Sequence, residues 1–271
     1  MREDAVAAAH PTGTATGHDE VRILRATHPD DNVRQPARGA VRVDGGHAVS
    51  GPDHRRRALV VRGGWPGHEP RAATDLFLPF LRGNGFDVDT SDSLDVYTDD
   101  ERMAATDLVV QCWTMGEATE DQVRGLADAV RAGTGLAGWH GGIIDAFRGS
   151  IDYQRLTGGQ FLWHAPGLTD FEVTVRPDHA HHPVVAGHHR LRLHSEQYWV
   201  ATDSHNEVLA ETVLPAGPDT PWDQPVTMPA IWTRTWGSGR VFVSTLGHHL
   251  PDLTDPAVRD ITGRGLLWAA R

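Results

Sequence analysis

The 271-residue chain has no lysine, a single cysteine and no long apolar run. All 25 basic residues are arginines, which excludes a P-loop lysine, a Schiff-base lysine and a lysine general base. We expect no nucleotide cofactor. With Cys112 alone, neither an internal disulfide nor a multi-cysteine metal site can form. No apolar run approaches the roughly 18–20 residues of a membrane span, and the N-terminus lacks a secretory signal pattern. We therefore expect a cytoplasmic protein without membrane contact.

Acidic charge is concentrated in the larger part of the chain. Residues 1–57 carry nine arginines and eight acidic residues, whereas residues 58–271 have a net charge of −12. Because phosphate backbones attract surplus Arg and Lys, this acidic part excludes nucleic acid as a partner. Residues 1–57 have few aliphatic side chains to offset their ordering entropy. We predict a largely irregular tail there, with at most a short strand near Val21–Leu24, that is mobile or packs on a neighbouring subunit of a homo-oligomer, and one domain over 58–271.

Short aliphatic strands alternate with amphipathic helices in the first half of this domain. Strands are predicted at Ala58–Val61, Phe86–Val88, Asp107–Gln111 and Gly135–Trp139. Apolar spacing predicts a helix from Ala73 to Phe80, kinked or restarted at Pro79. Thr119 and Gln122 form a capping box that opens a second helix. This alternation favours a mostly parallel sheet with helices on both faces.

The second half of the domain is typical of antiparallel structure. Residues alternate between apolar and polar in Phe171–Val175 and Arg190–Leu193, and Ile231–Trp236 and Arg240–Thr245 flank a glycine-rich turn that predicts a hairpin. Asp255 followed by Pro256 predicts the start of a final helix. The fold class is therefore α/β, with a mostly parallel central sheet and an antiparallel extension.

Three predicted strand ends carry residues suited to chemistry, namely Gly63–Glu69, Gln111–Trp113 and Gly138–Gly142. The carboxyl ends of parallel strands are where ligands bind. The third segment has the glycine frame of a nucleophile elbow, with His140 in the place of the nucleophile. Histidine serves as acid, base or metal ligand but does not replace the Ser or Cys of acyl transfer. Amidotransferase chemistry is thus disfavoured, and we expect Cys112 to be a small core residue.

Five separated segments carry further motifs, and they occur in a specific order. They are Gly64–His68, Trp139–Gly142 with Asp145–Arg148, Gly158–His164, Glu196–Tyr198, and Trp232 with Gly237–His248. In this combination, the chain from about Ala58 to its end resembles the trehalose-utilisation (ThuA-like) family. The resemblance implies a flavodoxin-like, class I glutamine amidotransferase-like three-layer sandwich without the amidotransferase cysteine. It also implies a role in the catabolism of disaccharides and their 3-keto derivatives, although Ser195 stands where the family usually has Asp.

Four residues form the predicted catalytic set. We expect His140 and Glu196 to be an acid/base pair, with His164 and His248 orienting the substrate or a metal. A divalent ion, Zn²⁺ or Mn²⁺, accepts mixed imidazole and carboxylate ligands. The predicted ligands are His164, Glu196 and His248, although no short-range ligand motif fixes them.

Aromatic residues complete the predicted site, because indole faces stack on sugar rings. The predicted substrate-binding residues are Trp65, His68, Trp113, Trp139, Asp145, Trp163 and Tyr198. Residues two apart on a strand share a face, so His194, Glu196 and Tyr198 are predicted to point the same way if one strand runs through all three. We expect an enzyme that acts on a disaccharide, glycoside or keto-sugar by acid/base chemistry, with or without a metal. The alternative is a non-catalytic carbohydrate-binding or scaffold protein on the same fold.

Overall fold

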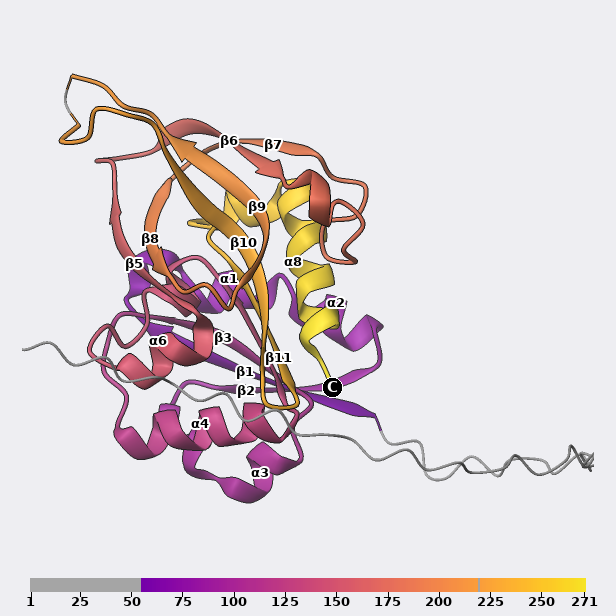
Figure 1. Cartoon of the computed structure of the whole chain (residues 1–271). Coiled ribbons are helices and arrows are strands. Elements are labelled where there is room, and N and C mark those ends of the chain that lie inside the picture. Colours follow the sequence, from indigo (N-terminus) through magenta and orange to yellow (C-terminus); the bar gives the residue numbers. More distant parts are fainter. Residues whose placement is uncertain (1–54, 219) are drawn as a thin grey trace, which may run out of the picture. The chain divides into compact units, whose positions relative to one another are not determined.

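The computed structural model describes residues 55–218 and 220–271. The expectations for the N-terminal tail, including the strand near Val21–Leu24, concern residues outside this part. A nine-stranded sheet organises the described residues, in the order β2-β1-β3-β4-β11-β10-β9-β6-β7 (Figure 1). β5 and β8 form a second, two-stranded sheet.

Five strands make up the parallel part of the large sheet. They are β1 (Arg56–Gly64), β2 (Phe86–Ser91), β3 (Leu108–Thr114), β4 (Gly135–Trp139) and β11 (Gly239–Ser244). Alternate residues of β1 enter two different hydrophobic clusters, Ala58 and Val60 on one face and Leu59 and Val61 on the other. Burial on both faces explains why these strands are continuous aliphatic runs. The predicted parallel strands are confirmed.

Helices cover both faces of this parallel part (Figure 1). One face is covered by α1 (Pro70–Asp75), α2 (Leu78–Gly83), α7 (Leu250–Thr254) and α8 (Pro256–Ala269), and the other by α3 (Asp100–Ala104), α4 (Glu120–Ala132), α5 (Gly141–Ile144) and α6 (Ile151–Thr157). The helix predicted from Ala73 to Phe80 is two helices, because α1 ends at Asp75 and α2 begins at Leu78. This agrees with the restart predicted near Pro79. The capping box of Thr119 and Gln122 is confirmed. None of the helices in the described residues has the length and apolarity needed to span a membrane.

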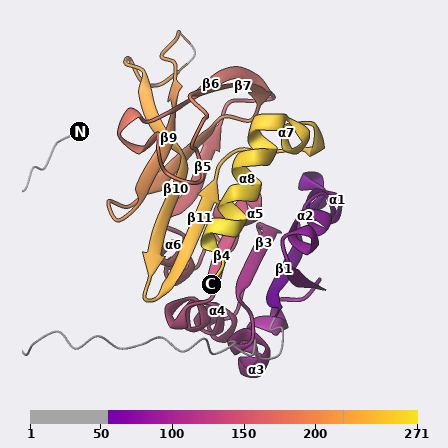
Figure 2. The same cartoon turned by 90° about the vertical axis from the view of Figure 1, so that its right-hand side faces the viewer.

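Antiparallel strands extend the sheet beyond β11, on the side away from β1 and β2 (Figure 2). They are β6 (Thr169–Val175), β7 (Arg190–Ser195), β9 (Glu207–Leu214) and β10 (Val226–Trp236). The α/β fold with an antiparallel extension is thus confirmed. β5 (Gly159–His164), β8 (Tyr198–Thr202) and β9 were not predicted. In β5, a register shift between Phe161 and Trp163 breaks the alternation that would have marked the strand.

β7 and β8 are separate strands and not one continuous strand, which contradicts one prediction. β7 ends at Ser195 and β8 begins at Tyr198, so Glu196 lies in the connection. His194 is on the exposed face of β7 and pairs with Asp170 at 2.8 Å. The prediction that His194, Glu196 and Tyr198 share one strand face is therefore wrong, because the three residues do not belong to a single strand.

Candidate functional site

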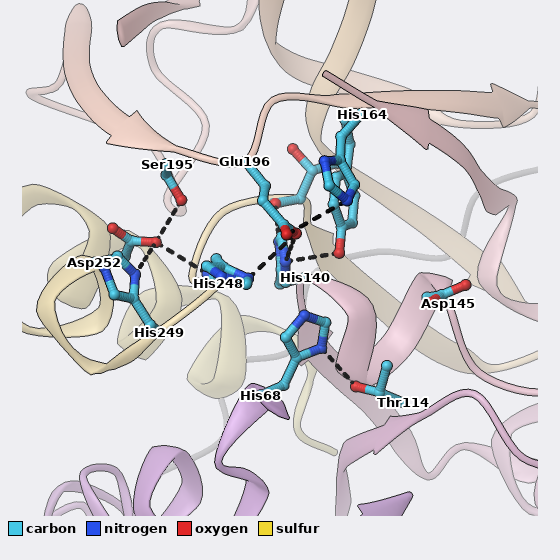
Figure 3. A network of polar contacts seen from close by, with 12 residues as sticks. His68, Thr114, His140, Asp145, His164, Ser195, Glu196, His248, His249 and Asp252 are labelled. Atoms are coloured by element: carbon cyan, nitrogen blue, oxygen red, sulfur yellow. Dashed lines mark hydrogen bonds and ion pairs between the residues drawn. The ribbon is translucent and has the colours of Figure 1, made fainter. Parts of the chain in front are cut away.

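Polar side chains meet where the parallel strands end (Figure 3). Thr114 closes β3, His140 follows β4 and His248 follows β11. His68 closes a short 3-10 helix, Pro66–His68, that follows β1. Glu196 enters from the connection between β7 and β8. The parallel strands thus supply the floor of the site at the edge where such sheets bind ligands, and the antiparallel part supplies its carboxylate.

The Glu196 carboxylate lies at the centre of this group. One of its oxygens is 3.1 Å from Nε2 of His140 and 3.2 Å from Nδ1 of His248, and the other oxygen is 3.4 Å from Nε2 of His164. The Glu196 side chain is 13% exposed. We call His68, His140, His164, Glu196, Tyr198 and His248 the Glu196 cluster. The structure therefore brings the four predicted catalytic residues together.

The turn after β4 holds His140 in an unusual conformation. Its φ is +48°, a value that non-glycine residues adopt only where the surroundings enforce it, often at functional sites. Its side chain is 2% exposed, with Nδ1 donating to the Thr245 carbonyl at 2.8 Å. The Tyr198 hydroxyl lies 2.6 Å from Nε2. The next residue, Gly141, has no room for a side chain, because a Cβ there would lie 2.5 Å from the His68 ring.

His68 packs its ring against two other imidazoles of the cluster. The ring centroids are 4.8 Å from His140 and 5.1 Å from His248. Nδ1 of His68 is hydrogen bonded to the Thr114 hydroxyl at 2.9 Å. Burial, together with the His140 and His248 rings, lowers the pKa of His68 to about 3. His68 is consequently a neutral imidazole at physiological pH.

Burial and charge act in opposite directions elsewhere in the cluster. Burial lowers the pKa of His140, although Glu196 and the Thr245 carbonyl raise it. Burial raises the pKa of Glu196, but the contacts with His140 and His248 outweigh it and bring the carboxyl pKa below its usual value. Burial and the Glu196 charge raise the pKa of Tyr198 well above 10. The cluster therefore combines a carboxylate whose pKa is lowered, a phenol whose pKa is raised and two imidazoles, those of His68 and His140, whose pKa values are lowered.

One subset of the cluster has the spacing of a metal site. His68, His140, Glu196 and His248 each offer a ligand atom, and these atoms all lie within 4.8 Å of one another. The ligand set predicted from the sequence shares Glu196 and His248 with this group. His164 lies outside it, with Nδ1 donating to the Ala165 carbonyl at 2.7 Å.

A buried carboxylate, that of Asp252, supports the His248 turn. It accepts from the His248 backbone N–H at 3.0 Å and from the Ser195 hydroxyl at 2.5 Å, and it lies 3.0 Å from Nδ1 of His249. Ser195, the departure from the family pattern, thus donates to this carboxylate.

Asp252 and Thr114 are not among the residues predicted from the sequence. Thr114 directly follows the predicted strand-end segment Gln111–Trp113, which was a signal for it in the sequence. The signal for Asp252 in the sequence is its position four residues after His248.

Three of the four predicted tryptophans reach the surface. Trp65 is 43% exposed and its ring centroid is 4.8 Å from that of His68. Trp163 is 39% exposed and makes an edge-on contact with Trp222 at 5.5 Å. Trp113 is half-buried at the end of β3. Trp65 is thus the indole that adjoins the cluster directly.

Three residues near the strand ends are buried within the protein: Trp139, Asp145 and Cys112. Trp139 is 2% exposed and packs on Phe77 at 5.0 Å, so its position is that of a core residue and not of a sugar platform. Asp145 is 3% exposed and pairs with Arg148 at 2.8 Å. Cys112 is 3% exposed, and burial raises the pKa of its thiol to about 12. The prediction of Cys112 as a core residue is confirmed.

Comparison with known proteins supports the resemblance noted from the motifs. The sequence model of the ThuA family, described as trehalose utilisation, matches residues 57–269. A ThuA-like protein from Parabacteroides merdae ATCC 43184 has 18% identity and a TM-score of 0.63 over 79% of this chain and 90% of that chain.

Two further solved structures share the fold. A ThuA-like protein from Bacteroides uniformis ATCC 8492 has 18% identity and a TM-score of 0.61, over 83% of this chain and 92% of that chain. A cytoplasmic protein of Salmonella typhimurium LT2 has 14% identity and a TM-score of 0.57, over 80% and 100%. No curated protein matches the chain. Since the family model covers most of its length, the chain belongs to the ThuA family of trehalose utilisation.

Proposed function

We propose that this protein is an enzyme that processes a disaccharide, glycoside or keto-sugar, and that the reaction takes place at the Glu196 cluster. The observation that carries the proposal is the position of the Glu196 carboxylate, within 3.4 Å of imidazoles from three separate parts of the chain. The family description favours a sugar as the substrate. Groups placed in this way transfer protons, and such catalysis typically contributes about 10²–10⁴-fold.

Exposure separates the groups that can touch a substrate from those that act behind them. The side chain of His164 is 30% exposed, whereas that of His140 is 2% exposed. A general acid or base has to come within hydrogen-bond distance of its substrate. We therefore assign substrate contact to His164, His248 and Glu196, whose side chains are 30%, 18% and 13% exposed. His140 stands behind Glu196, where it exchanges a proton with Glu196 or with the Tyr198 hydroxyl, which revises the acid/base pair expected from the sequence.

The surroundings of the cluster suit a neutral sugar. The exposed indole of Trp65 lies next to His68 and offers a flat apolar face. The chain carries a net charge of −11, which disfavours anionic substrates. The exposed indole of Trp163 and the half-buried indole of Trp222 offer a second aromatic surface. These same indoles would also serve a non-catalytic carbohydrate-binding protein, which is the second candidate function.

Two expectations from the sequence remain proposals alongside this function. The parallel strand order β2-β1-β3-β4-β11 supports a flavodoxin-like arrangement of the α/β part. The Salmonella structure is described as a cytoplasmic protein, which supports a cytoplasmic location. We also retain the expectation of a homo-oligomer.

Turnover assays and calorimetry test the proposal. The full chain would be screened against disaccharides, glycosides and their 3-keto derivatives, with and without a chelator. We expect Glu196→Gln and His140→Ala to abolish turnover while His189→Ala, an exposed histidine outside the cluster, has no effect. Saturable sugar binding without product would instead favour the binding protein. Unchanged turnover in a folded Glu196→Gln variant would refute the assigned site.

A further inference from the structure

We propose that the Glu196 cluster binds one divalent transition-metal ion through His68, His140, Glu196 and His248. Among such ions we expect Zn²⁺ to be preferred. The four ligand atoms of these residues lie within 4.8 Å of one another. Ligands at about 2.0–2.2 Å from Zn²⁺ in a tetrahedron are roughly 3.3–3.6 Å apart. Side-chain rotations that draw the rings inward by about 1 Å therefore complete the site.

Hydrogen bonding fixes which nitrogen of His140 faces the centre. Nδ1 lies 2.8 Å from the Thr245 carbonyl, which only accepts, so Nδ1 carries the hydrogen. In the neutral ring, Nε2 then has a single lone pair, and a cation that takes this lone pair leaves the Tyr198 hydroxyl, 2.6 Å away, to donate to Glu196 instead. Nε2 is also 3.1 Å from a Glu196 oxygen, which is a second acceptor. Two lone pairs at this distance repel each other unless a positive charge lies between them.

The contact of the same Glu196 oxygen with His248 is also not a hydrogen bond. Nδ1 of His248 is 3.2 Å from the same oxygen, yet this buried nitrogen makes no hydrogen bond within the described residues. A buried carboxylate needs a partner, because its desolvation is costly. A proton satisfies only one of these contacts at a time. A central cation satisfies the carboxylate and both imidazole nitrogens together.

The outer contacts of the rings match those of metal-binding histidines. Such residues almost always donate their second N–H to an oxygen, which fixes the ring. His140 donates to the Thr245 carbonyl, and Nδ1 of His68 lies 2.9 Å from the Thr114 hydroxyl. Three imidazoles and one carboxylate suit Zn²⁺ and its first-row neighbours, whereas Mg²⁺ and Ca²⁺ prefer oxygen ligands.

The metal site uses residues of the proposed active site but does not depend on the proposed reaction. A bound cation would occupy His140 and Glu196 as ligands. His164, 3.4 Å from the other Glu196 oxygen and partly exposed, would then be the group that moves a proton at the substrate. The cation would supply a Lewis acid for a substrate oxygen or a bound water.

Titration of the chelator-treated full chain with Zn²⁺ tests the inference. Calorimetry should show one tight site per chain, and Co²⁺ in its place should give visible absorption bands. We expect Glu196→Gln to weaken Zn²⁺ binding at least about 100-fold. Glu117→Gln, an exposed position outside the cluster, should leave the tight site intact. His68→Gln serves as a second variant, and circular dichroism checks that both fold.

The outcomes separate the metal site from the proposed function. The chain has 17 histidines, so a weak background is expected in every variant. Wild-type binding no tighter than that of folded Glu196→Gln or His68→Gln overturns the metal site and leaves a shared proton in its place. Tight Zn²⁺ binding without any sugar turnover would refute the proposed function and support the metal site. Sugar turnover by a protein that binds no metal would support the proposed function and refute the metal site.

Discussion

Gly141→Ala tests whether close packing between His68 and the turn after β4 builds the site. The added Cβ would lie 2.5 Å from Cε1 and 2.7 Å from Nδ1 of His68. Since carbon contacts are normally about 3.5–4.0 Å, the ring or the turn has to shift by about 1 Å. Overpacking of this kind costs about 1–3 kcal/mol in the free energy of unfolding. The shift also breaks the hydrogen bond to Thr114 that orients the ring, for which we expect a loss of about 10–100-fold in Zn²⁺ affinity.

Chemical denaturation and Zn²⁺ calorimetry measure the two effects on the same protein. Gly149→Ala is the matched control, because a Cβ there has no atom within 4 Å and the residue does not have a positive φ. The control should change the free energy of unfolding by less than about 0.5 kcal/mol. If Gly141→Ala kept both wild-type stability and wild-type Zn²⁺ affinity, the reasoning that this glycine is required for the approach of His68 would be refuted.

Three further substitutions or modifications probe separate contacts of the site and its surroundings. Tyr198→Phe removes the hydroxyl that lies 2.6 Å from His140, so turnover should fall about 100-fold while stability falls by about 1 kcal/mol; unchanged turnover would exclude Tyr198 from proton transfer. Ser195→Asp places a second carboxylate against buried Asp252 and should destabilise the protein more than Ser195→Ala in urea denaturation; the opposite order would contradict this. Native Cys112 should resist iodoacetamide, because its pKa of about 12 keeps the thiol protonated, whereas labelling as fast as in the unfolded chain would show that β3 opens.

The α/β half of the fold was predictable because its signals are local. The capping box of Thr119 and Gln122, the break near Pro79 and the aliphatic strands each depend on a few neighbouring residues. The strands β5 and β8 escaped prediction for the opposite reason. They pair across long sequence separation, and the register shift in β5 interrupts the alternation of side chains.

The predicted orientation of Glu196 relative to its neighbours is wrong because one strand ends earlier than the sequence pattern indicates. Alternation along the chain suggested that His194 and Tyr198 lie on the same face as Glu196, but β7 ends at Ser195. His194 consequently points to the surface, while Glu196 turns inward to His140 and His248. The motifs predicted the residues of the cluster and the pairing of His140 with Glu196, whereas the contacts of His68 with the other imidazoles were not predicted.

The amino-acid order alone determined the α/β class, the family and the residue types able to do acid/base or metal chemistry, because these depend on periodicity and on short motifs. Only the tertiary structure decided that Glu196 faces three imidazoles, that His68 joins them and that Trp139 belongs to the core. These contacts join residues more than 30 positions apart. Their geometry depends on sheet order and on the packing of separate loops, which no local pattern encodes.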